Sequence, residues 1–180
     1  MKNETNKNGS VNLESLVDRL RNEDQRYSRL SKGIQIVYFV LLPIYVLLLV
    51  VHIIEGSTWY EIFGSVCFAL SMLIFALFFR RYYKEYKYVD YAQPTLSMLK
   101  DAAFRYQPFQ WRMIWLVLAL FFMDIGLSLT TFQMAYTVLV QILFLGSLGI
   151  ATIIGYIIWW FRYRPLRMDT LKLIKEIEED

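Results

Sequence analysis

The sequence predicts an all-α integral membrane protein with four transmembrane helices. Of its 180 residues, 57% are hydrophobic and only 19% are charged, whereas soluble domains are usually about 45–50% apolar and about 25% charged. The charges are also segregated, because long uncharged stretches alternate with short basic ones. Composition and charge placement together favour lipid as the solvent for most of the chain.

The first two spans are predicted at residues 33–54 and 60–79. The first stretch contains no Asp, Glu, Lys or Arg. As a helix it would rise about 33 Å, enough to cross a hydrocarbon core of ~30 Å. Residues 62–79 are also uncharged, and Trp59 and Tyr60 precede them as interfacial aromatics.

Residues 113–161 contain a single charge, Asp124. One helix of that length would reach about 73 Å, more than twice the membrane core, so the segment must fold back. The polar residues between Ser128 and Gln133 are the best place for a turn. We therefore expect the third and fourth spans at residues 113–130 and 135–161.

The basic residues predict the orientation of these spans. All 19 Lys and Arg residues lie in residues 1–32, 80–112 and 162–180, and the connections 55–61 and 130–135 have none. Basic segments flanking spans stay in the cytoplasm. The spans should therefore form two antiparallel hairpins with cytoplasmic termini, in the plasma membrane or a bacterial inner membrane.

The three basic segments also predict amphipathic cytoplasmic helices, because apolar residues recur in them at three- and four-residue spacing. In residues 1–32 the stripe is interrupted at Glu23 and Asp24. The stripes are Leu13, Leu16, Val17, Leu20, Tyr27 and Leu30; then, after Pro94, Leu96, Leu99, Ala103 and Tyr106; then, after Pro165, Leu166, Leu173, Ile174 and Ile177. These helices could pack together, receive a partner's helix, or lie on the membrane surface.

Asp124 is the most informative polar residue, because a carboxylate deep in a span is costly and often functional. Counting from the charged rims places Tyr45 at a similar depth, Ser128 one turn away, and Gln141 near the same layer. One hypothesis is a proton- or cation-coupled site. The alternative, which we prefer from sequence, is a protonated clamp that hydrogen-bonds two helices together.

Two further patterns predict contacts within the membrane and at its surface. Ser147, Ala151 and Gly155 form a small-residue ladder that favours close helix packing, within the chain or in a homo-oligomer. Anionic lipid headgroups are the expected partners of the basic residues that follow the second span: Arg80, Arg81, Lys84 and Lys87. Their place beside a span argues against a nucleic-acid interface.

Metal, cofactor and catalytic motifs are weak or missing in the sequence. His52 and Glu55 share a helical face, with Glu61 across the turn, but they make only a weak metal-site candidate. The single Cys and single His exclude cysteine-pair metal sites and paired-histidine haem ligation. No catalytic motif is visible, so we expect no cofactor and no enzyme activity.

The function hypothesis rests on how the chain outside the spans is divided between the two sides of the membrane. Residues 1–32, 80–112 and 162–180 are cytoplasmic and patterned, while the outer connections are short. This favours a membrane-anchored regulatory or interaction protein whose cytoplasmic helices bind a protein partner. The alternative is a small transporter or channel subunit that uses Asp124.

Overall fold

The structure is a computed structural model that describes residues 13–179, and all regular structure in that range is helical. Residues 1–12 of the predicted N-terminal segment, and residue 180, lie outside the described part. The helices are α1 (Leu13–Ile54), α2 (Trp59–Lys87), α3 (Thr95–Arg105), the 3₁₀ helix η1 (Trp111–Met113), α4 (Ile114–Thr130), α5 (Thr137–Ile158), the π-helix η2 (Trp159–Tyr163) and α6 (Arg164–Glu179).

Four of the helical stretches in residues 13–179 are long and apolar enough to cross a membrane. They are α1, α2, η1 with α4, and the continuous run from α5 through η2 to α6. The predicted number of spans is therefore confirmed, and the chain is a multi-pass membrane protein. Two of these helices extend well beyond the apolar runs, since α1 begins 20 residues before residue 33.

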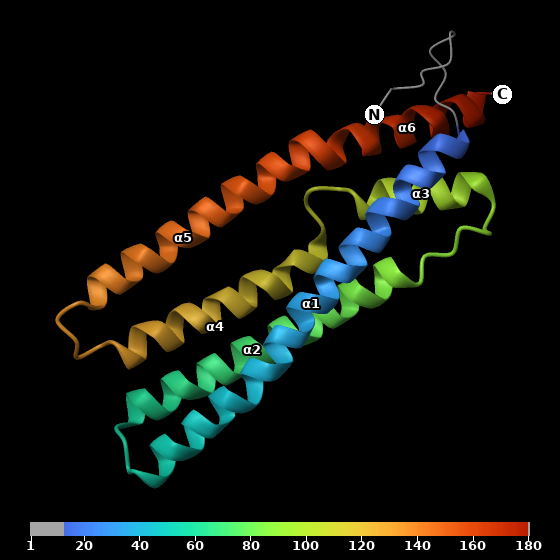
Figure 1. The fold of residues 1–180 in the computed structure, drawn as a ribbon. Coiled ribbons are helices and arrows are strands. Elements are labelled where there is room, and N and C mark those ends of the chain that lie inside the picture. The colour runs from blue at the N-terminus through green and yellow to red at the C-terminus, as the bar shows by residue number, and fades with distance from the viewer. Residues whose placement is uncertain (1–12, 180) are drawn as a thin grey trace.

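The apolar helices are not packed evenly (Figure 1). α2 is central, because both α1 and α4 pack along it, whereas α5 touches α4 only sparsely. None of the residues of α5 is buried. The chain thus presents α1, α2 and α4 as one packed unit, with α5 diverging from it.

Two glycines bring α2 and α4 into close contact. A Cβ atom built on Gly64 would lie 2.8 Å from Thr130 Cγ2 and 3.1 Å from the Gly126 carbonyl oxygen. A Cβ on Gly126 would lie 3.0 Å from the Gly64 carbonyl oxygen. Removing side-chain bulk at a crossing lets two backbones approach. Further along, the Ser71 hydroxyl donates a 2.8 Å hydrogen bond to the Ala119 carbonyl.

A second core lies where the basic segments meet. This core is formed by the first turns of α1, by one face of α3, and by α6. The end of α2 contributes the buried Tyr86, whose ring stacks on Tyr27 of α1. Its buried apolar residues are Leu16, Leu20, Met98, Leu99, Ala102, Ala103, Tyr106, Tyr163, Leu166, Leu173 and Ile174. The three predicted amphipathic stripes therefore bury one another.

The first stripe contains two charged residues, Glu23 and Asp24, and α1 runs through them without a break. Asp24 is only 1% exposed and continues the four-residue spacing of Leu16 and Leu20, whereas Leu30 is 54% exposed. The physical reason is that hydrogen bonds and an ion pair compensate the cost of burying the Asp24 carboxylate.

Candidate functional site

The most elaborate polar cluster lies inside this second core, around Asp24. Tyr106 donates its hydroxyl to Asp24 Oδ1 at 2.5 Å, and Tyr91 donates to Oδ2 at 2.6 Å. Arg105 Nη2 donates to the same Oδ2 at 3.1 Å. The Asp24–Arg105 pair is shielded from solvent, with side chains 2% and 9% exposed. One carboxylate therefore ties α1 to α3 and to the connection that precedes it.

Burial raises the pKa of the Tyr106 and Tyr91 hydroxyls above their ordinary value, and the Asp24 carboxylate adds to the rise through its charge and its hydrogen bonds. Both phenols consequently remain protonated donors at neutral pH. A hydrogen bond to a charged group contributes ~1.5–3 kcal/mol. The arrangement is suited to holding helices in register, because every Asp24 partner comes from another segment.

Stacked aromatic rings and a second ion pair extend the cluster toward the membrane. The ring of Tyr27 lies 4.8 Å from that of Tyr86, and the ring of Tyr106 lies 5.7 Å from that of Tyr163. Glu23 accepts two hydrogen bonds from Arg162, at 2.9 and 2.6 Å. Adjacent residues of α1 thus bind α3 and η2, the segment at the end of the fourth span.

Asp24 was not among the site residues predicted from the sequence, although one signal was present. Leu16, Leu20, Asp24 and Ser28 follow one another every four residues, so they share one helical face. Tyr106 belongs to the predicted stripe after Pro94, but Tyr91 and Arg105 had no comparable signal. Their positions depend on how the connection before α3 folds back onto α1.

The predicted intramembrane residues are brought together only in part. Gln141 of α5 donates a hydrogen bond to Ser128 of α4. Tyr45 instead packs its ring against Phe68 of α2, with the ring centroids 5.5 Å apart. Asp124 Oδ1 is buried and forms no hydrogen bond within residues 13–179. Asp124 precedes Ser128 by four residues, so it lies on the same face of α4.

The predicted small-residue ladder has no partner within the described chain. Ser147, Ala151 and Gly155 are all exposed, and a Cβ on Gly155 would meet nothing within 4 Å. The expected close contact is therefore not intramolecular here. It remains a prediction for a second copy or another membrane protein.

At the opposite end of the spans, two of the three weak metal candidates, His52 and Glu61, have other partners. His52 Nδ1 lies 2.7 Å from the Ser65 hydroxyl, and Glu61 accepts hydrogen bonds from both the backbone and the hydroxyl of Thr58. These last bonds cap the start of α2. No group of three or more His, Cys, Asp or Glu residues that could hold a metal ion occurs in residues 13–179.

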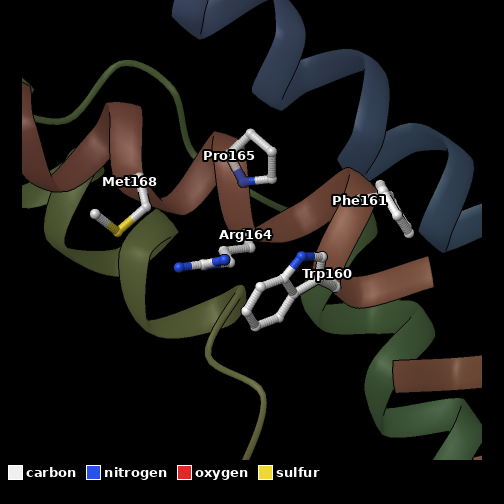
Figure 2. A pocket seen from close by; sticks show the side chains of 5 residues that line it. All are labelled: Trp160, Phe161, Arg164, Pro165 and Met168. Atoms are coloured by element: carbon white, nitrogen blue, oxygen red, sulfur yellow. The ribbon is translucent and has the colours of Figure 1, made fainter. Parts of the chain in front are cut away.

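The basic residues predicted to contact lipid are all exposed: Arg80, Arg81, Lys84 and Lys87. Lys87 Nζ also lies 5.3 Å from the ring centroid of Tyr83. A second basic feature lies at the end of the fourth span, where Arg164 packs on the Trp160 ring at 3.8 Å. Figure 2 shows Arg164 between Trp160 and Met168, which line an open hollow of about 360 Å³.

No match to this chain is found among protein-family models, curated proteins or solved structures. Its function must therefore be argued from its own residues. The Asp24 cluster and the helices that it joins are the strongest structural feature from which to start.

Proposed function

We propose that this chain is a membrane-anchored regulatory or interaction protein with both termini in the cytoplasm. In this proposal α1, α3 and α6 form a cytoplasmic recognition unit for a protein partner. The observation that carries the proposal is the shared core of these helices, fastened by Asp24 to Tyr91, Arg105 and Tyr106. Such a rigid unit offers a preformed surface, which lowers the entropic cost of binding.

The mode of binding follows from what the core buries. The apolar stripes of the three helices pack against one another, so they are not free to receive a partner's helix. A partner would bind the outer surface instead, where exposed side chains such as Phe104 on α3 remain. Because α1 and the α5–α6 run continue directly into the membrane, the unit is held at a fixed height above the bilayer.

Site-specific photocrosslinking in intact cells tests this proposal. A photoreactive side chain at exposed Phe104 or Lys175 should give a discrete protein adduct, whereas one at lipid-facing Ile142 on α5 should not. Asp24→Ala should abolish the adduct by loosening the core, and Asp101→Ala, at an exposed position of α3, should preserve it. Normal insertion without any protein adduct from α1, α3 or α6 positions would contradict the proposal.

The proposed orientation has its own test. Reporters fused after residue 32, within residues 84–106, or at the C-terminus should report the cytoplasm, because basic flanks are retained there. A reporter inserted between Gly56 and Thr58 should report the opposite side. An exported C-terminus would overturn both the orientation and the two-hairpin arrangement.

A second candidate function is a small proton- or cation-coupled transporter or channel subunit, favoured by Asp124 itself. The clamp hypothesis requires a hydrogen-bond partner, yet Asp124 Oδ1 is buried without one in the described residues. Ionisable residues in spans often mark ion or proton pathways. Ser128 lies on the same face of α4 as Asp124, and Gln141 of α5 donates a hydrogen bond to Ser128. Such a site would therefore extend from α4 toward α5.

Proton flux in liposomes separates the two candidates. For a transporter, wild type should carry protons, and Asp124→Asn should abolish the flux while melting as wild type does. Gln141→Leu breaks the neighbouring polar contact and serves as a comparison for general damage to this layer. Absence of flux in wild type would exclude the proton-coupled form and leave the recognition unit as the proposal.

A further inference from the structure

A hollow of about 350 Å³ lies between α1 and α2, just beyond the apolar part of both helices. Its lining residues are Gln25, Ser28, Arg29 and Lys32 from α1, and Tyr83, Tyr86 and Lys87 from α2. Three of these side chains are cations and none is acidic. The hollow is thus a two-helix basic cleft, which we call the α1–α2 cleft.

The cations of the α1–α2 cleft differ from four arginines of the same basic segments. Arg19, Arg105, Arg112 and Arg162 each form an ion pair with a carboxylate. Arg29, Lys32 and Lys87 form none within residues 13–179. Like charges gathered in one hollow repel one another, and a bound anion would relieve that repulsion.

The depth of the cleft matches the level of lipid phosphates. Lys32 immediately precedes the uncharged stretch 33–54, while Tyr83 and Lys87 follow Phe79 by four and eight residues. At 1.5 Å per residue these two lie about 6 and 12 Å beyond the end of the second apolar run. The headgroup region extends about 5–7 Å beyond the hydrocarbon core on each side, so Lys32 and Tyr83 lie at its level and the Lys87 backbone lies just outside it.

We propose that the α1–α2 cleft binds the phosphate headgroup of an anionic phospholipid, with Arg29 and Lys32 of α1 and Lys87 of α2 as the phosphate ligands. Tyr83 adds a hydroxyl and an aromatic ring at the same level. Lys87 Nζ lies 5.3 Å from the centroid of the Tyr83 ring and 5.2 Å from that of the Tyr88 ring. This assignment goes beyond the proposed partner-binding function and does not depend on it.

The cleft also refines the lipid contact expected from sequence. Lys87 belongs to the predicted set, but Arg80, Arg81 and Lys84 do not line the hollow. Arg29 and Lys32, which were not in that set, join it because α1 packs along α2. Each Lys or Arg near a membrane surface contributes about 1 kcal/mol of attraction to anionic lipid, so converging charges select strongly over zwitterionic lipid.

Native mass spectrometry of the full chain in neutral detergent tests the assignment. The probes are short-chain phosphatidylglycerol, short-chain phosphatidylcholine and inorganic phosphate, each titrated alone. Wild type should bind one phosphatidylglycerol clearly more tightly than phosphatidylcholine. The double variant Arg29→Gln/Lys32→Gln should weaken phosphatidylglycerol binding about tenfold or more, because two charges are removed. Lys87→Gln should weaken it from the α2 side.

Arg164→Gln is the matched control, because it removes one charge from the other interfacial hollow, which has similar size but a single cation. It should leave phosphatidylglycerol affinity unchanged. A loss as large as that of Lys87→Gln would show diffuse surface charge and overturn the site. Equal binding of the two lipids would also overturn it. Inorganic phosphate that binds as tightly as phosphatidylglycerol would overturn the choice of lipid.

The variants remain interpretable because Arg29, Lys32 and Lys87 are exposed and outside the buried core. Circular dichroism and the melting temperature of each variant should therefore match wild type. Full phosphatidylglycerol affinity in folded Arg29→Gln/Lys32→Gln protein would contradict the proposal directly.

Discussion

The Tyr106 hydroxyl donates a 2.5 Å hydrogen bond to Asp24 Oδ1 and so joins α3 to α1 across 82 residues of sequence. Asp24 is 1% exposed and Tyr106 is 4% exposed, so water cannot replace either partner. A bond of this kind makes α1 and α3 depend on one another for stability. The first two predictions follow from it.

Asp24→Ala should destabilise the protein by about 3–5 kcal/mol, because it leaves Arg105 as a buried charge without its partner. Tyr106→Phe should cost less, about 1–3 kcal/mol, since it removes one hydrogen bond to a charged acceptor. Denaturation in detergent, followed by circular dichroism, measures both. Asp101→Ala, at an exposed position of α3, is the control and should melt as wild type does. An equally stable Asp24→Ala protein would show that the cluster is not structural.

Alkaline pH should destabilise the second core. Burial beside Asp24 raises the pKa of Tyr106 and Tyr91 above the ordinary value of 10.0. The unfolded chain therefore releases these protons at lower pH than the folded chain does. The free energy of unfolding consequently falls as pH rises. The contribution of these phenols is fully present below pH 10.0 and is lost as pH climbs toward their raised pKa values.

Melting temperature and tyrosinate absorbance, measured together across the alkaline range, check this pH dependence. Exposed tyrosines should ionise first, and the remaining tyrosines should ionise only as the protein unfolds. Tyr106→Phe should show a shallower fall in stability with pH, because it has one fewer phenol with a raised pKa. Identical slopes in wild type and Tyr106→Phe would contradict the assignment.

Gly126→Ala should loosen the contact between α2 and α4. The added Cβ would lie 3.0 Å from the Gly64 carbonyl oxygen and 3.2 Å from the Phe68 ring, so a backbone or a packed ring must move. Overpacking of this kind costs ~1–3 kcal/mol. Gly149→Ala is the matched control, because its Cβ meets nothing within 4 Å. Comparable melting of the two variants in detergent would disprove a tight crossing.

Gly155→Leu should leave the stability of the isolated chain unchanged, because no described residue packs against that face of α5. If the ladder mediates self-association, the same change should reduce dimer formation in membranes, measured by crosslinking between copies. Ile153→Leu, at an exposed position of α5, is the comparison variant. A lower melting temperature for monomeric Gly155→Leu protein would instead show an intramolecular contact.

Local properties of the sequence were enough to predict the spans. The stretch 33–54 and the polar break before residue 135 are continuous in sequence, and transfer into lipid depends on the residues of each stretch themselves. The helices after Pro94 and around Pro165 were likewise predictable, because the spacing of Leu96 and Leu99 or of Leu173 and Ile174 requires no distant partner.

The candidate site was less predictable, because its contacts join segments that are far apart. The sequence indicated Asp124 by its isolation in an apolar stretch, but the packing of α1 and α4 on α2 decides that Tyr45 contacts Phe68. Depth in the membrane can be counted along each helix. The direction in which a side chain faces around the helix axis, by contrast, depends on the neighbouring helices against which that helix packs.

The sequence by itself determined that this chain has four segments long and apolar enough to cross a membrane, and where its charges gather, because hydropathy and charge act within each segment. Only the tertiary structure decided that Asp24 is a buried anchor and that Gly64 meets Gly126. Only tertiary structure, likewise, brought Arg29 and Lys87 to one cleft. The physical reason is that burial, close approach and charge convergence each depend on two segments meeting, and the packing of α1 and α4 on α2, and of α3 on α1, selects which segments meet.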